Sequence, residues 1–147
     1  MTLDEKVMVF VVMASEMFKK KSSAIFKDYG VTFPHYNVLK YLTACEGGRD
    51  TVGNVSKRML VTGANVTGLA KRMEKAGLIE RQNDVKDERL TVLQITPMGV
   101  NCLDAIREIQ GQHVKEYLHT YSNERKEEVL SVLKHIVRKG KQLAEPK

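Results

Sequence analysis

The sequence is poor in features that define several large classes of protein. It has no Trp and only two cysteines, Cys45 and Cys102, which lie far apart and show neither a CxxC motif nor Cys–His ligand spacing. Its longest apolar run, residues 7–14, has charges close on both sides and falls well short of the roughly 20 residues that cross a bilayer. These absences argue against a disulfide framework, a cysteine-based metal site and a transmembrane helix.

Motifs of catalysis and export are missing as well. The four histidines form no HExxH pair, and there is no GxSxG motif, no phosphate-binding glycine loop and no conspicuous carboxylate pair. Asp4 and Glu5 stand where a signal peptide has its cationic start. We therefore expect a cytoplasmic protein with no enzymatic activity, metal or cofactor. Cys45, near an expected helix end, is an ordinary reduced thiol or, given a basic neighbour that lowers its pKa, a redox sensor.

The sequence does have a moderate excess of positive charge. Lys and Arg number 24 against 18 Asp and Glu, so the net charge is +6 and the pI is near 9.3. The segment from Gly53 to Gly99 has eight basic and five acidic side chains and so carries +3 of that charge. This balance favours a polyanionic partner. The length of 147 residues indicates about one domain.

Apolar residues recur at helical spacing over most of the chain, and capping residues mark where helices begin. Thr32, Thr62 and Thr96 are suitable N-caps, and Gly77 is a suitable left-handed C-cap. The expected helices span residues 3–28, 33–45, a short segment after residue 52, residues 63–76, a segment from 97 to about 118, and residues 122–143.

A β-hairpin is expected after the fourth helix. Leu78–Gln82 and Thr91–Thr96 have strand composition and flank the polar turn 83–88, and a further short strand is expected at residues 50–52. Leu93 and Ile95 alternate with Val92 and Gln94, which predicts a strand buried on one face only.

The helix that follows Thr62 has two different faces. Val66 and its apolar neighbours form one face, and Val61 can pack against Val66 across the cap. The other face suits a DNA major groove, because Asn65 can pair with adenine and Lys71 with guanine. An ordinary solvated face is the alternative. The candidate DNA-reading residues are Thr62, Ala64, Asn65, Thr67, Gly68, Lys71 and Lys75.

Two details of this region bear on DNA binding. Gly68 lies mid-helix, at a cost of about 1 kcal/mol relative to Ala, so it either admits a close approach by DNA or another helix or is merely tolerated. Arg89 near the hairpin tip can enter a narrow minor groove, held by Asp87; a surface ion pair worth about 0–1 kcal/mol is the alternative. The candidate wing residues are Arg81, Lys86, Asp87 and Arg89.

The order helix, helix, helix, reading helix, hairpin, helix, helix resembles the MarR (multiple antibiotic resistance regulator) family of winged-helix repressors over essentially the whole chain. Asp87-Glu88-Arg89, followed by Leu93 and by residues 95–99, resembles the family's D-x-R and LT-x-x-G pattern. Residues 66–81 resemble its helix-to-wing pattern, although Gly68 stands where family members often carry Arg.

The resemblance implies a mainly α fold with a small β wing. By this resemblance, the chain comprises a dimerisation helix (1–30), a winged helix-turn-helix (31–99) and C-terminal dimerisation helices (100–147), and two copies form an intertwined homodimer. The apolar stripes of the terminal helices independently favour a partner, because a small winged helix cannot cover them. The resemblance also implies a small aromatic or anionic effector. Met13, Met17, Phe33, His35 and Tyr36 could line its pocket, or could be ordinary core residues.

The expected function is a sequence-specific, DNA-binding transcriptional regulator. It would repress pseudo-palindromic operators on double-stranded DNA, with half-sites about 10 bp apart, and be released by a small-molecule effector. The alternative is a winged-helix module that binds protein rather than DNA.

Overall fold

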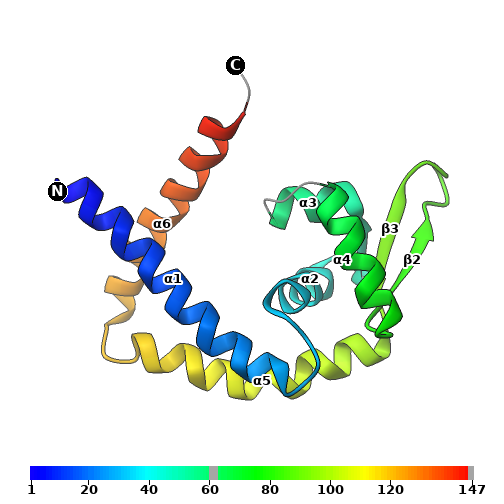
Figure 1. Ribbon diagram of the computed structural model, residues 1–147, viewed down its shortest axis with the longest axis horizontal. Helices are drawn as coiled ribbons and strands as arrows, with labels where there is room; N and C mark the ends of the chain where they lie inside the picture. Colours follow the sequence, from blue (N-terminus) through cyan, green and yellow to red (C-terminus); the bar gives the residue numbers. More distant parts are fainter. Residues whose placement is uncertain (60–62, 146–147) are drawn as a thin grey trace. The chain divides into compact units, whose positions relative to one another are not determined.

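The computed structural model describes residues 1–59 and 63–145, apart from the side chains of residues 63 and 64. The chain divides into two compact units, Met1–Gln110 and Gly111–Lys147. No helix within the described residues is long and apolar enough to cross a membrane. The elements labelled in Figure 1, together with two short ones, are α1 (Leu3–Lys27), α2 (Phe33–Ala44), η1 (Glu46–Gly48), β1 (Arg49–Thr51), α3 (Val52–Met59), α4 (Gly63–Lys75), β2 (Ile79–Asn83), β3 (Thr91–Ile95), α5 (Pro97–Leu118) and α6 (Asn123–Ala144).

Helix starts in the described residues follow the expected capping chemistry. Thr32 caps α2, because its Oγ1 accepts the His35 N–H at 3.3 Å while the Thr32 N–H donates to His35 Nδ1 at 3.3 Å. At the start of α5, Thr96 Oγ1 accepts the Gly99 N–H at 3.0 Å. Both predicted caps are confirmed, whereas the predicted Thr62 cap and its Val61 contact lie outside the described residues.

The end of α4 is a Schellman motif built on Gly77, whose φ is +78°. The Leu78 N–H donates to the Met73 carbonyl at 3.0 Å, and the Gly77 N–H donates to the Glu74 carbonyl at 2.9 Å. The Thr96 hydroxyl then donates to the Gly77 carbonyl at 2.6 Å. The predicted left-handed C-cap is therefore confirmed, and it directs the chain straight into the hairpin.

The three strands form an antiparallel sheet in the order β1-β3-β2, which confirms the hairpin and the short strand near residue 50. The predicted alternation in β3 is only partly right. Leu93 and Ile95 are buried, but Val92 on the other face is buried too, at 3% exposure. In the central strand β3, Val92 has Cα partners on both sides, Thr51 on β1 and Gln82 on β2.

One hydrophobic core holds the winged-helix part of the first unit together. It includes Phe26 of α1, Leu39 of α2, Met73 of α4 and Leu93 of β3, each fully buried. In Figure 1 the β2–β3 hairpin lies beside α4, and β2 contacts this helix. The reading helix and the wing are therefore anchored in the same packed interior.

Residues 100, 103, 106, 109, 113 and 117 recur at helical spacing, which predicts one inward-facing stripe on α5. Leu103 and Ile106 are buried in this core, and His113 is buried too. Ile109, which was expected to face inward, is 44% exposed, whereas Gln110 is buried. Gln110 Nε2 donates to Ser22 Oγ of α1 at 3.1 Å, in a buried hydrogen bond. The helical phase that buries residues 103, 106 and 110 excludes 109, so this part of the prediction was wrong.

The glycine after the Thr96 cap is required by close packing rather than by its backbone conformation. A Cβ at Gly99 would clash with the carbonyl oxygen of Leu78, and would lie 2.9 Å from Ile95 Cγ1 and 3.2 Å from Leu39 Cδ2. A backbone carbonyl cannot move aside as the end of a flexible side chain can. Gly99 therefore sets how closely α5 approaches the start of the wing.

We expect Gly99→Ala to lower the free energy of unfolding by about 1–3 kcal/mol, the usual cost of overpacking a core. The matched control is Gly111→Ala in the same helix, where a Cβ meets nothing within 4 Å, and the gain in helix propensity stabilises by up to about 1 kcal/mol. Urea denaturation followed by circular dichroism measures both. Equal stability of the two variants would contradict the close approach.

Candidate nucleic-acid interface

Helix α4 has the two faces that its sequence predicts. Asn65, Lys71 and Lys75 are exposed, while Thr67 and Gly68 are half-buried. Two candidate reading groups, Thr62 and the side chain of Ala64, lie outside what the structure describes. The opposite face is buried and consists of Val66, Leu69, Ala70 and Met73.

Gly68 is not made necessary by packing within the described chain. A Cβ there would meet only Arg72 Nη1, at 3.7 Å, which is an ordinary van der Waals distance. Of the expected explanations, close approach by another helix of the same protomer is thus unsupported. Approach by an external partner and simple tolerance both stay open.

The wing tip is ordered by its own acidic side chains. Asp84 Oδ1 accepts the backbone N–H groups of Lys86 at 2.8 Å and Asp87 at 3.0 Å, which forms a tight Asx turn. The Asp84 N–H donates to the Leu90 carbonyl at 2.9 Å and closes the loop. The backbone that presents the basic residues of the tip is therefore fixed locally.

Asp87 holds Arg89 by two side-chain hydrogen bonds, as the sequence predicts. Arg89 Nε lies 3.0 Å from Asp87 Oδ1, and Arg89 Nη2 lies 3.3 Å from Oδ2. These bonds hold the pKa of the Asp87 carboxyl below its ordinary value. The Arg89 side chain is nevertheless 91% exposed, so its guanidinium is oriented without being covered.

Arg81, the other arginine of the predicted wing set, has a different environment. Its Nε and Nη2 lie 3.0 Å and 2.9 Å from Oε1 of Glu74 on α4, and its backbone N–H lies 2.8 Å from Oε2. Its side chain is 32% exposed. The pairing with Glu74 was not predicted, because the two residues lie on different elements and no local pattern links them.

A hydrogen-bonded cluster behind the interface was also missed. The Asp50 carboxylate accepts the Tyr41 hydroxyl at 2.6 Å and the Asn54 amide at 2.7 Å, which ties β1 to α2 and α3. Burial would raise the pKa of Asp50, but these hydrogen bonds lower it overall. Within the described residues, Cys45 Sγ contacts the Tyr41 carbonyl and the Asp50 carboxylate, neither of which is the basic neighbour that a redox sensor requires.

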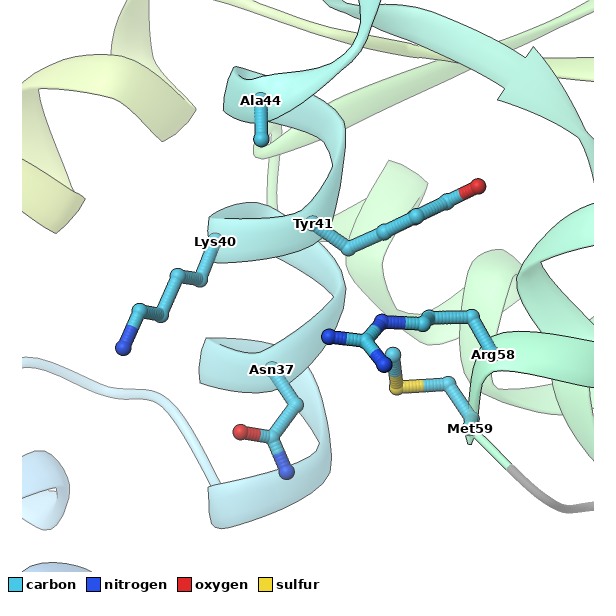
Figure 2. A pocket seen from close by; sticks show the side chains of 6 residues that line it. All are labelled: Asn37, Lys40, Tyr41, Ala44, Arg58 and Met59. Carbon is cyan, nitrogen blue, oxygen red and sulfur yellow. The ribbon is translucent and has the colours of Figure 1, made fainter. Parts of the chain in front are cut away.

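A pocket of about 450 Å³ lies between α2 and α3. Figure 2 shows Arg58 reaching from α3 toward α2, and the Tyr41 ring extending from α2 toward α3. Neither Lys40 nor Arg58 has a carboxylate within 4.0 Å among the described residues. In Figure 2 the Lys40 side chain extends away from Arg58, and its Nζ lies 5.9 Å from the centroid of the Tyr36 ring. Its lining residues are Asn37, Lys40, Tyr41, Ala44, Arg58 and Met59.

The residues predicted to line an effector pocket have other surroundings in the protomer. Phe33 and Tyr36 pack on Phe26, with ring centroids 5.8 Å and 4.3 Å away, so they belong to the aromatic core. His35 is engaged in the α2 cap, and burial, with a smaller effect of the Arg72 charge, lowers its pKa. Met13 and Met17 on α1 are 49% and 66% exposed.

Sequence comparisons place this interface among transcriptional regulators. Residues 29–90 match the model of the MarR family. An uncharacterized HTH-type transcriptional regulator of Bacillus subtilis, YsmB, is 26% identical over 74% of this chain and 73% of its own length. The HTH-type transcriptional regulator SarZ of Staphylococcus haemolyticus is 22% identical over 92% of this chain and 89% of its own.

Solved structures of transcriptional regulators share the fold. AbsC of Streptomyces coelicolor superposes with a TM-score of 0.87 at 19% identity, with 97% of each chain covered. Sco3205 of the same organism, solved in complex with DNA, gives 0.85 at 19% identity over 100% of this chain and 92% of its own. The organohalide-sensing regulator RdhR-CbdbA1625, in its 2,4-dichlorophenol-bound form, gives 0.86 at 17% identity over 98% and 85%. The expected resemblance to the MarR family is confirmed: residues 29–90 match its model, the chain is similar to HTH-type transcriptional regulators, and it shares the winged-helix fold of solved MarR family members.

Proposed function

We propose that this protein is a repressor that binds pseudo-palindromic operators and is released by a small-molecule effector. The observation that carries the DNA-binding mode is that α4 exposes a polar and cationic face beside a hairpin whose tip holds Arg89 oriented and 91% exposed. A helix of this kind fits a major groove, and an exposed arginine on a rigid loop fits the adjacent minor groove.

Individual residues have separate roles in this proposal. Asn65 and Lys71 read base edges, and Gly68 lets the α4 backbone come close to them. Arg89, oriented by Asp87, enters the minor groove. Ala64 contacts a thymine methyl group. The remaining DNA-facing groups of the proposal, which position the protein on the phosphates, are Thr62, Thr67, Lys75 and Lys86.

We expect Arg89→Ala to weaken operator binding about tenfold. It should also lower the magnitude of the slope of log affinity against log salt by about one, because the variant has one cationic side chain fewer on the DNA and displaces about one counterion fewer. Lys71→Ala is expected to relax base preference instead, because a bidentate contact to guanine discriminates by about 1–3 kcal/mol. Fluorescence anisotropy with a duplex selected from a random pool measures both. Circular dichroism controls for folding, and unchanged affinity of Arg89→Ala would remove the wing from the mechanism.

The exposed apolar side chains of the terminal helices favour a second copy of the chain as the partner. None of the described residues of α6 is buried, although a 22-residue helix owes most of its stability to packing. Val129, Leu130 and Leu133 are 39–51% exposed and line an apolar groove of about 450 Å³ together with the end of α5. On α1, Phe10 is 66% exposed. Such apolar stripes need cover, and a twofold dimer provides the two reading units that a pseudo-palindrome requires.

We expect sedimentation velocity to give a mass of twice 16.7 kDa at micromolar concentration. Leu133→Asp places a charge in the proposed interface and is expected to produce monomers with reduced helicity. Lys134→Asp, one residue further along the same helix, changes a polar exposed position and keeps the dimer. A wild-type mass of 16.7 kDa would exclude the dimer and, with it, simultaneous binding of two half-sites.

The effector part of the proposal is supported by the pocket between α2 and α3. Arg58 and Lys40 favour an anion, while the Tyr41 ring and the Met59 thioether favour a flat apolar body. Because α3 also contacts α4, a ligand here can bias the position of the reading helix. The predicted group of Met13, Met17, Phe33, His35 and Tyr36 stays a second candidate site, and the dichlorophenol complex of the related regulator supports an aromatic ligand.

A panel of aromatic carboxylates and phenols tests this pocket by release of bound operator. We expect Arg58→Gln to raise the concentration needed for release about tenfold, since a hydrogen bond to a charged group is worth about 1.5–3 kcal/mol. The control is Arg107→Gln on α5, whose side chain is 71% exposed and is not among the residues that line the pocket. Release that is equally efficient from Arg58→Gln would move the effector to the other candidate group.

The alternative, a winged-helix module that binds protein, has no specific observation in its favour. A role on operator DNA also agrees with the cytoplasmic location expected from the sequence. No catalytic role is proposed, and no cluster of three metal-ligating side chains occurs within the described residues.

A further inference from the structure

Glu74 and Arg81 join the last turns of α4 to the middle of β2 through three contacts. Glu74 Oε1 lies 3.0 Å from Arg81 Nε and 2.9 Å from Nη2, and Oε2 accepts the Arg81 backbone N–H at 2.8 Å. The carboxylate thus binds both the side chain and the backbone of the strand. Charge-assisted contacts of this kind are stronger and more directional than a single surface ion pair.

The Glu74–Arg81 pair lies where it can restrain the orientation of the wing. At the junction itself, the Gly77 cap and the Thr96 hydroxyl fix only the first residues after α4. Arg81 lies further along β2, in the part of this strand whose side chains are exposed, opposite the buried Leu93 of β3. Glu74 therefore restrains the hairpin at a point that the junction contacts do not reach.

We propose that Glu74 and Arg81 form a brace that sets the angle between the reading helix and the wing, and that Arg81 acts by positioning the wing rather than by contacting DNA. The inference rests on the proposed DNA binding. If α4 and Arg89 must enter adjacent grooves together, a wing already held at the right angle avoids the entropic cost of ordering it on binding. Once α4 is bound in its groove, the wing is then present at a high effective concentration at the adjacent groove, and the reverse also holds.

The contrast between the wing's two arginines supports this assignment. Arg81 is 32% exposed and bonded to another element. Arg89 is 91% exposed, and its partner among the described residues is Asp87, two residues away. Contact with Arg81 would require DNA to compete with the Glu74 carboxylate for the guanidinium. The negative charge of Glu74 would also oppose a phosphate at that position.

Glu74→Gln tests the brace because charge and positioning predict opposite results. If Glu74 has no role in positioning the wing, removing its negative charge near DNA leaves the affinity for operator DNA unchanged or raises it. If Glu74 is part of the brace, Glu74→Gln lowers that affinity. We expect the affinity to fall about five- to tenfold. Arg81→Gln is expected to lower affinity by a similar factor, and the double variant by no more than either single one. None of the three should change the salt slope. The control is Glu80→Gln, an exposed position on β2, which removes the same charge and should not weaken binding.

Two DNA-free measurements separate the brace from the proposed function. The hydrogen bonds from Arg81 hold the pKa of Glu74 below its ordinary value, and Arg81→Gln should raise it in a carboxyl NMR titration. Residual dipolar couplings should show β2 and β3 reoriented relative to α4 in Glu74→Gln, with the melting temperature reported alongside. Unchanged couplings would overturn the brace, even if the wild type bound no DNA. A salt slope lowered by about one in Arg81→Gln, with undiminished affinity in Glu74→Gln, would overturn it in favour of a phosphate contact.

Discussion

Burial of one face of α4 is the constraint on which the interface depends. Val66, Leu69, Ala70 and Met73 lie in the same core as Leu93 of the wing, so the helix cannot rotate about its axis without exposing this face to water. Full burial of one such apolar side chain is worth about 1.5–3 kcal/mol. The polar face is presented outward as a consequence, and the hydrophobic core, rather than any DNA-facing group, decides which residues are available for reading.

The features that the sequence predicted correctly are those with local causes. The Thr32 and Thr96 caps and the Gly77 turn each depend on residues within a few positions of one another, and the pairing of Asp87 with Arg89 spans two residues. The helical phase of α4 could be inferred from its own period. Such features are specified by short-range chemistry, so a single sequence contains enough information to place them.

The features that were missed depend on how distant segments meet. Val92 is buried although it lies on the face opposite Leu93, and no alternation pattern shows whether the rest of the fold covers that face. Glu74 meets Arg81, and Arg58 meets the α2 surface, only after the hairpin and the helices have packed. The wing set predicted from charge therefore grouped Arg81 with Arg89, although the two guanidiniums have different surroundings.

The buried hydrogen bond between Gln110 and Ser22 has a consequence for how α1 and α5 can move. Sliding either helix along the other by one turn would leave the amide and the hydroxyl facing hydrocarbon, at a cost of about 1–3 kcal/mol for each unsatisfied group. A polar pair in an apolar seam thus fixes the relative register of two helices. This hydrogen bond therefore opposes slippage between α1 and the part of α5 that lies in the first unit.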